Sequence, residues 1–129
     1  TRTVFVGRAS DEDRAVYNVV LEANLAGEAA VREGATAQDV DRAARAVIEK
    51  AGYGEHFLNR TGQGIGGANH EAPYIMEGNL QVLEKGMAFS VEPGIYIPGR
   101  LGIRIEDIVL VTEKGAEPLS FYPKEITIA

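Results

Sequence analysis

Two strand-like, apolar runs each contain an acid: Phe89-Ser90-Val91-Glu92-Pro93-Gly94 and Arg104-Ile105-Glu106-Asp107. Their strands are central to the fold predicted below. Such runs normally exclude acids, since an unpaired buried charge costs much free energy. A cation or another polar partner must therefore compensate Glu92 and Glu106. These two acids mark the candidate site.

The run around Glu106 alternates apolar and polar side chains, as a strand with one buried face does. This pattern predicts Arg104 and Glu106 on the same face of one strand, with Ile103 and Ile105 on the opposite face. Two converging carboxylates suit hard divalent cations such as Mn²⁺, or Zn²⁺ and Co²⁺ when a nitrogen ligand is added. The alternative for Glu106 is a structural ion pair with Arg104 or another base at a sheet edge.

The sequence on both sides of these stretches predicts an α+β fold. Apolar runs bounded by glycine and proline predict strands over residues 3–6, 87–91, 94–97, 103–111 and 125–128. Between the first two of these strands, Ser10 and Thr36 stand at N-cap positions, and Gly34 and Gly52 end two apolar stripes of helical spacing. We therefore expect a curved, mostly antiparallel sheet with two amphipathic helices packed on one face.

Composition narrows the function classes. With 129 residues the chain is long enough for one domain, and the absence of cysteine excludes disulfides, zinc fingers and thiol nucleophiles. A net charge of −6 argues against nucleic acid as a partner, because such binding depends on neutralising phosphates. No signal peptide or membrane-spanning run is recognisable, so we expect no membrane partner and a cytoplasmic location.

A glycine-rich stretch, residues 61–71, precedes the two acids. Gly62, Gly64 and Gly67 fit the dinucleotide pattern G-x-G-x-x-G, but that pattern requires a helix to follow, and Pro73 opposes one. We therefore expect these glycines to let the backbone approach a ligand or another strand closely. His70, at the end of the stretch, is a candidate ligand or proton donor, with a hydrogen-bonded structural histidine as the alternative.

The same segments, in this order, resemble the pita-bread metallopeptidases, above all the Xaa-Pro dipeptidases (prolidases) and aminopeptidase P. Residues 1–3 are similar to the family's T-R-T, and residues 70–74 to its H-E-x-P-Y. Residues 90–96 match S-V-E-P-G-I-Y, and residues 102–107 match G-x-R-I-E-D. The resemblance runs through nearly the whole chain and implies that residues 1–129 are the C-terminal portion of a pita-bread catalytic domain.

The resemblance assigns roles to these residues. It implies that Glu92 and Glu106 are metal ligands and that Glu92 is also the general base toward a bridging water. His70 would hydrogen-bond the scissile carbonyl or the developing oxyanion, and Arg104 would hold the neighbouring carboxylates and shape the substrate pocket. The implied cofactors are divalent ions (Mn, Co or Zn), the implied substrates are Xaa-Pro peptides, and family members commonly form homodimers.

Two departures from the family pattern bear on activity. The family's G-H-G-I-G supplies a histidine ligand, and Gln63 stands at that position. The family's two aspartate ligands precede T-R-T, so we expect this chain alone to be inactive and not to assemble a working dinuclear metal centre. The main interpretation is a piece of a metal-dependent peptidase. The alternatives are a pita-bread pseudoenzyme acting as a binding module, and a metal-free hydrolase of the creatinase type.

Overall fold

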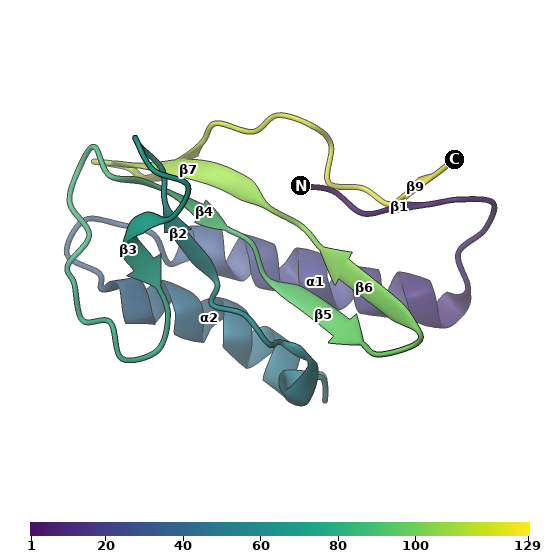
Figure 1. Cartoon of the computed structure of the whole chain (residues 1–129). Coiled ribbons are helices and arrows are strands. Elements are labelled where there is room, and N and C mark those ends of the chain that lie inside the picture. Colours follow the sequence, from purple (N-terminus) through teal and green to yellow (C-terminus); the bar gives the residue numbers. More distant parts are fainter.

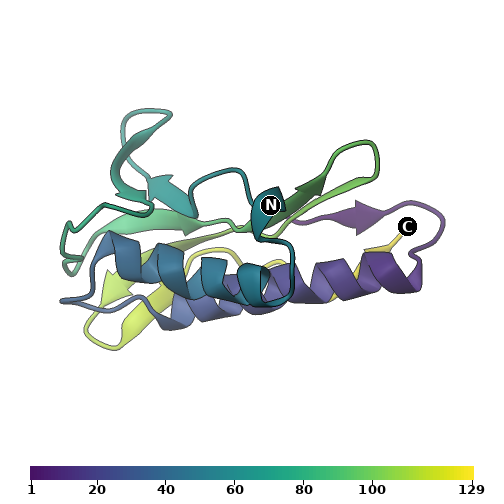
Figure 2. The ribbon, with the colours of Figure 1, turned by 90° about the horizontal axis from the view of Figure 1, so that it is seen from below.

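Two helices lie side by side on one face of a bent sheet in the computed structural model, which describes all residues from Thr1 to Ala129 (Figures 1 and 2). Helix α1 spans Asp11–Ala29 and helix α2 spans Ala37–Lys50. Both begin with the predicted caps, since Ser10 and Thr36 each form a complete capping box. The α+β prediction, with both helices on one face, is confirmed. None of the helices is both long and apolar enough to cross a membrane.

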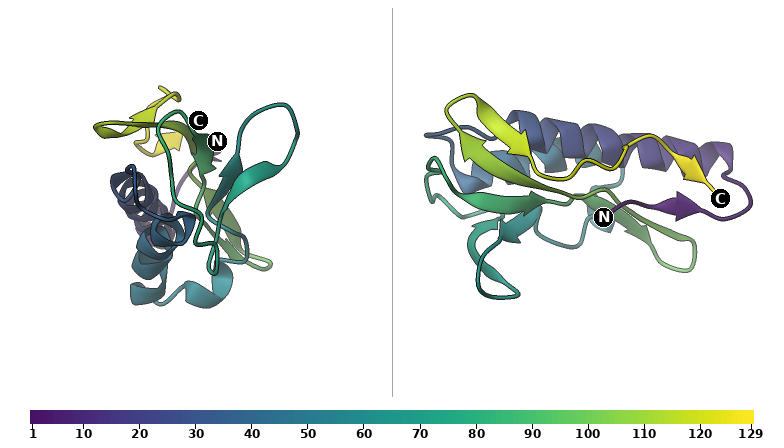
Figure 3. Two further views of the ribbon diagram at one scale, coloured as in Figure 1. Left: turned by 90° about the vertical axis from the view of Figure 1, so that its left-hand side faces the viewer. Right: turned by 90° about the horizontal axis from the view of Figure 1, so that it is seen from above.

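The strands form three sheets. The largest has the order β3-β2-β4-β7-β8 and is antiparallel throughout. A separate antiparallel hairpin pairs β5 with β6, and a short parallel pair joins β1 to β9, near the two ends of the chain (Figure 3). The elements not yet given are β1 (Val4–Phe5), the short helix η1 (Gly54–His56), β2 (Gly62–Gly64), β3 (Glu71–Ile75), β4 (Ala88–Val91), β5 (Gly94–Ile97), β6 (Leu101–Arg104), β7 (Asp107–Thr112), β8 (Gly115–Pro118) and β9 (Thr127–Ile128).

The single strand expected over residues 103–111 is wrong. It is two strands, since β6 ends at Arg104 and pairs with β5, whereas β7 begins at Asp107 and pairs with β4. Burial still alternates through Ile105 and Glu106, so the sequence pattern did not reveal that the chain changes sheets. A matching break separates β4 from β5 at Glu92 and Pro93. We call the two breaks together the joint.

The core has two parts, one on each side of the joint. The first lies between the large sheet and the helices and includes Val40, Phe89 and Val109. The second lies between α1 and the β5–β6 hairpin and includes Val20, Ile95 and Ile103. The helices thus bury apolar surface on both sides of the joint, and this burial stabilises the packing of both the large sheet and the β5–β6 hairpin on the helices.

The glycine-rich stretch begins as a strand. A Cβ on Gly62 would lie 1.7 Å from the Ser90 carbonyl oxygen, and one on Gly64 would lie 2.1 Å from that of Ala72. These glycines therefore serve close strand approach, as predicted. The sequence did not indicate β3, which contains Pro73 and lies at the edge of the large sheet, where a proline is tolerated.

Candidate functional site

Glu92 and Glu106 face each other at the joint. In the strand pairing, Val91 lies opposite Asp107 on one side and Gly94 lies opposite Arg104 on the other, so the two acids occupy the gap between the paired segments. Both side chains are partly buried, and each carboxyl group lies close enough to the other to affect its pKa. Two negative charges at this place would repel each other.

Their surroundings separate the two pKa values. Burial raises the pKa of Glu92 above its usual range and the nearby charge of Glu106 adds to this, although Ser90 and Arg104 oppose it. Burial also favours the neutral form of Glu106, but the Thr1 hydroxyl and amino group, with Glu92 and Arg104, outweigh it and lower the pKa of Glu106. Glu92 therefore holds its proton more strongly than Glu106 does.

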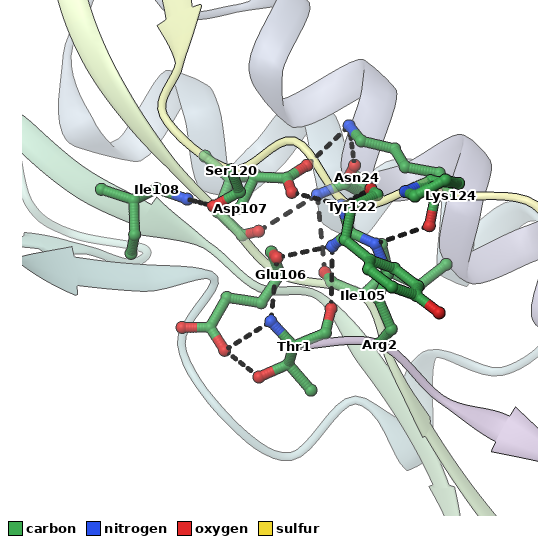
Figure 4. A network of polar contacts seen from close by, with 12 residues as sticks. Thr1, Arg2, Asn24, Ile105, Glu106, Asp107, Ile108, Ser120, Tyr122 and Lys124 are labelled. Atoms are coloured by element: carbon green, nitrogen blue, oxygen red, sulfur yellow. Dashed lines mark hydrogen bonds and ion pairs between the residues drawn. The ribbon is translucent and has the colours of Figure 1, made fainter.

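The first two residues of the chain hold Glu106 (Figure 4). The Thr1 hydroxyl donates a hydrogen bond to the Glu106 carboxylate, and the Thr1 amino group lies 3.6 Å from the same oxygen. The Arg2 guanidinium donates to the Glu106 carbonyl oxygen at 2.8 Å and to Asp107 Oδ1 at 2.7 Å. The alternative for Glu106 was an ion pair with Arg104 or another base; it forms none with Arg104, but it does pair with the Thr1 amino group. Both the side chain and the backbone of Glu106 are thus fixed.

A buried polar network lies behind Glu106 (Figure 4). Asp107 is fully buried between Arg2 and Lys124, whose Nζ lies 2.6 Å from Asp107 Oδ2. Lys124 also donates to Asn24 at 2.7 Å and to Glu28 at 3.0 Å, so it ties the C-terminal segment to α1. The sequence offered one signal for this network, an aspartate within an apolar run, but the basic partners are distant in the chain.

Glu28 gives this network a pH dependence. Burial, with the nearby Asp107 carboxylate, raises the pKa of Glu28 to about 7, although Lys124 opposes the shift. A carboxyl whose pKa is higher in the folded than in the unfolded chain contributes stability that is complete below its unfolded pKa and is lost as the pH rises through the folded value. This loss should therefore fall between pH 4.5 and about 7.

We expect the substitution Glu28→Gln to flatten this part of the stability profile. From pH 5 to 8 the wild-type free energy of unfolding should fall, relative to the variant, by on the order of 1–3 kcal/mol. Urea unfolding at several pH values measures the difference, and Glu22→Gln, an exposed change on the same helix, is the control. Parallel profiles for wild type and Glu28→Gln would contradict the assignment.

Helix α2 positions the other wall of the site. The buried Asp41 carboxylate accepts a hydrogen bond from the Thr61 hydroxyl at 2.7 Å and pairs with Arg45 at 3.1 Å. Arg45 in turn donates to the carbonyl oxygens of Phe57 and Asn59, and its guanidinium lies 4.0 Å from the centre of the Phe57 ring. The segment leading into β2 is therefore held on α2 just before Gln63.

Gln63, His70 and Glu92 line one cavity of about 430 Å³, together with Leu58, Asn59, Arg60 and Met76. The Gln63 side-chain oxygen accepts a hydrogen bond from Arg60 and contacts His70 Nδ1. Three of the predicted site residues thus line the same cavity. Glu106 is not in the lining but lies next to Glu92. Arg104 lies beside the acids, and its Nε is buried without a hydrogen-bond partner.

Arg60 was not recognised from the sequence. It stands next to the glycine-rich stretch, but no periodicity separates it from the other basic residues of the chain. Its contacts with Gln63 and His70 become evident only when β2 and β3 pair.

The joint fits a divalent cation in part. Two neighbouring carboxylates offer oxygen ligands of the kind that hard cations prefer, and a cation would relieve their repulsion. However, no group of three or more histidine, aspartate or glutamate side chains within residues 1–129 is arranged to hold a metal ion. Glu92 and Glu106 can therefore supply two ligands, and a complete centre needs others.

The chain is similar to known proteins over nearly its whole length. Residues 1–113 match the model of metallopeptidase family M24. A Xaa-Pro dipeptidase of Lactobacillus helveticus is 49% identical over 128 residues, which is 99% of this chain and 35% of that protein. The chain thus spans about a third of the length of this relative.

Solved structures show the same relation. Dipeptidase PepE from Mycobacterium ulcerans superposes with a TM-score of 0.96 at 50% identity, over 98% of this chain and 34% of its own. A Xaa-Pro dipeptidase from Bacillus anthracis gives a TM-score of 0.96 at 48% identity, over 99% of this chain and 36% of its own. The fold described above is that of part of the pita-bread structures.

Proposed function

Because the chain belongs to metallopeptidase family M24, we propose that it forms the C-terminal part of the catalytic domain of a metal-dependent Xaa-Pro peptidase, which cleaves the bond before proline. The observation that carries the proposal is the pair of facing carboxylates at the joint, each in a stretch that resembles a ligand motif of the family. The names of the related dipeptidases and the one-third share of their length support it.

Four residues of this chain would each have a separate role in metal binding or peptide hydrolysis. Glu92 and Glu106 would hold divalent cations, which when bound polarise a carbonyl and lower the pKa of water. Glu92 would also accept the proton of the attacking water. His70, exposed at the cavity, would donate a hydrogen bond to the oxygen on which negative charge develops. Arg104 would hold the two carboxylates in place and shape the substrate pocket.

We propose further that this chain alone does not form a working centre. Its two facing acids do not make a three-ligand cluster, and the Gln63 oxygen is already engaged by Arg60. The engaged Gln63 is also the observation that favours the second candidate, a pseudoenzyme that keeps the fold as a binding module. The two candidates differ in whether cations bind at the joint.

Metal binding by the chain tests the proposal. Mn²⁺ should broaden the amide resonances around Glu92 and Glu106 selectively, because the ion is paramagnetic. Glu92→Gln or Glu106→Gln should weaken this binding at least roughly tenfold, since each removes a charged ligand from the first coordination shell. Glu84→Gln, an exposed change, is the matched control.

Two results would count against the metal site. One is broadening spread evenly over exposed acids. The other is equal Mn²⁺ affinity in the Glu92→Gln, Glu106→Gln and Glu84→Gln proteins. Either would favour the binding module.

A further inference from the structure

Helix α1 places one fully buried amide, that of Asn24, against the joint (Figure 4). Asn24 Nδ2 donates to the Val91 carbonyl oxygen at 3.1 Å and to the Ile105 carbonyl oxygen at 3.4 Å. Val91 directly precedes Glu92, and Ile105 directly precedes Glu106. One side chain therefore connects the two segments that carry the candidate metal ligands. We call these two hydrogen bonds the amide bridge.

The backbone itself makes little contact across the joint. The pairing of β4 with β7 ends on one side of it, and the pairing of β5 with β6 begins on the other. Between them, one backbone hydrogen bond links the two breaks, from the Ile105 N–H to the Pro93 carbonyl oxygen at 3.4 Å. The Ile105 carbonyl oxygen accepts no backbone hydrogen bond. A buried carbonyl without a donor is costly, so Asn24 supplies the hydrogen bond that the ladder lacks here.

Lys124 determines which way the Asn24 amide points. An ammonium group can only donate, and Lys124 Nζ lies 2.7 Å from Asn24 Oδ1. The amide oxygen must therefore face Lys124, which leaves the NH₂ group to face the joint. Lys124 is itself held by ion pairs with Glu28 and Asp107, so the orientation of the amide is fixed from behind.

Gly27 brings α1 close enough for this short side chain to reach the joint. It lies one turn after Asn24 and is buried. A Cβ on Gly27 would lie 2.9 Å from Val91 Cγ1 and 3.4 Å from Ala44 Cβ. The missing side chain thus lets the helix approach β4 closely beside the amide bridge.

We propose that Asn24 is a positioning residue that sets the separation of Glu92 and Glu106. Because the amide bridge holds the carbonyl group just before each acid, neither acid can move away from the other without breaking one of its hydrogen bonds. Groups held in place lose less conformational freedom when a ligand binds between them, and this favours affinity. The inference rests on the proposed function for the identity of the bound ion, but not for the amide bridge.

Amide hydrogen exchange in the metal-free chain tests the amide bridge. Asn24→Asp keeps the shape of the side chain but replaces the NH₂ donor with an acceptor. Exchange at Ile105 should then rise by a factor at least roughly tenfold greater than at Val109, in the middle of β7, because two hydrogen bonds at the joint are lost. If Asn24 served only overall stability, the rise at Ile105 would not exceed the rise at Val109.

Mn²⁺ binding tests the consequence for the two acids. Asn24→Asp should weaken binding at the joint at least roughly tenfold, as the loss of an outer-shell partner does. The added negative charge would by itself attract the cation, so a loss of affinity cannot come from charge. Val16→Ala, which shortens a buried side chain earlier on the same helix, is the control for lost stability and should bind Mn²⁺ as the wild type does.

Melting curves show whether each variant is folded. Asn24→Leu, which has neither a donor nor a charge, replaces Asn24→Asp if that protein does not fold. Two results would overturn the inference. One is a rise in exchange at Ile105 no greater than at Val109, and the other is equal Mn²⁺ affinity in the Asn24 variant and Val16→Ala. A wild-type chain that binds no Mn²⁺ would count against the proposed function instead, and the exchange rates alone would then decide the inference.

Discussion

The substitution Gly62→Ala should unfold the protein. A Cβ at this position would lie 1.7 Å from the Ser90 carbonyl oxygen and 2.7 Å from its carbonyl carbon, and both are backbone atoms of the central strand β4. Backbone in the middle of a sheet cannot yield by that amount, so β2 must separate from β4. We expect a loss of more than about 4 kcal/mol, a large part of the 5–15 kcal/mol that ordinarily stabilises a domain.

Urea unfolding followed by circular dichroism measures this loss, and the same glycine-rich stretch contains the control. Gly67 has nothing within 4 Å of an added Cβ and is not among the glycines with positive φ, so Gly67→Ala should change stability by no more than about 0.5 kcal/mol. A Gly62→Ala protein as stable as Gly67→Ala would mean that β2 does not pair with β4 as described. The wall of the site that carries Gln63 would then be placed wrongly.

The substitution Gln63→His should strengthen divalent-metal binding at the joint. Imidazole nitrogen is a better donor to Zn²⁺, Co²⁺ or Mn²⁺ than an amide oxygen, and the oxygen of Gln63 is already engaged by Arg60. Losing an outer-shell partner typically costs roughly 10–100-fold in affinity, and a first-shell ligand should matter more. We therefore expect Co²⁺ affinity to rise at least roughly tenfold in this chain.

Calorimetric titration of both proteins with Co²⁺ measures the change. Asn59→His, which places an imidazole elsewhere in the lining of the same cavity, is the control for a general effect of added histidine. Gln63→His should exceed both wild type and Asn59→His in affinity. Equal affinities in the three proteins would show that position 63 does not face the metal ligands. The assignment of the glycine-rich stretch to the family's G-H-G-I-G motif would then be wrong.

Sequence patterns predicted the parts of the fold that depend on neighbouring residues. The two helices followed from Ser10 and Thr36, whose capping boxes need only the residues that come next. The glycines of β2 were correctly linked to close strand approach. By contrast, the alternation through Ile105 and Glu106 is the same whether a strand continues or changes sheets, so the joint was invisible to periodicity.

The site was predictable to the extent that charge in an apolar run is unusual. Glu92 and Glu106 stood out for this reason, and the structure brings them together. Arg60 and Lys124 did not stand out, because an arginine or lysine among polar residues is ordinarily an exposed one. Their importance comes from partners such as His70 and Asp107, which strand pairing and the C-terminal segment bring near.

The parallel pairing of β1 with β9 bears on the order of folding. Val4 lies beside Thr127, and Glu106 takes its contacts from Thr1 and Arg2, so these interactions close some of the longest loops the chain can form. Loop-closure entropy delays such contacts, whereas the helices and the β5–β6 hairpin depend on local ones. We expect Glu106 to be among the last residues to become fixed and the first to be released in local opening. The Glu106 N–H donates to the Thr1 carbonyl oxygen, and Val109 lies in the middle of the following strand, β7. Amide hydrogen exchange should therefore be faster at Glu106 than at Val109.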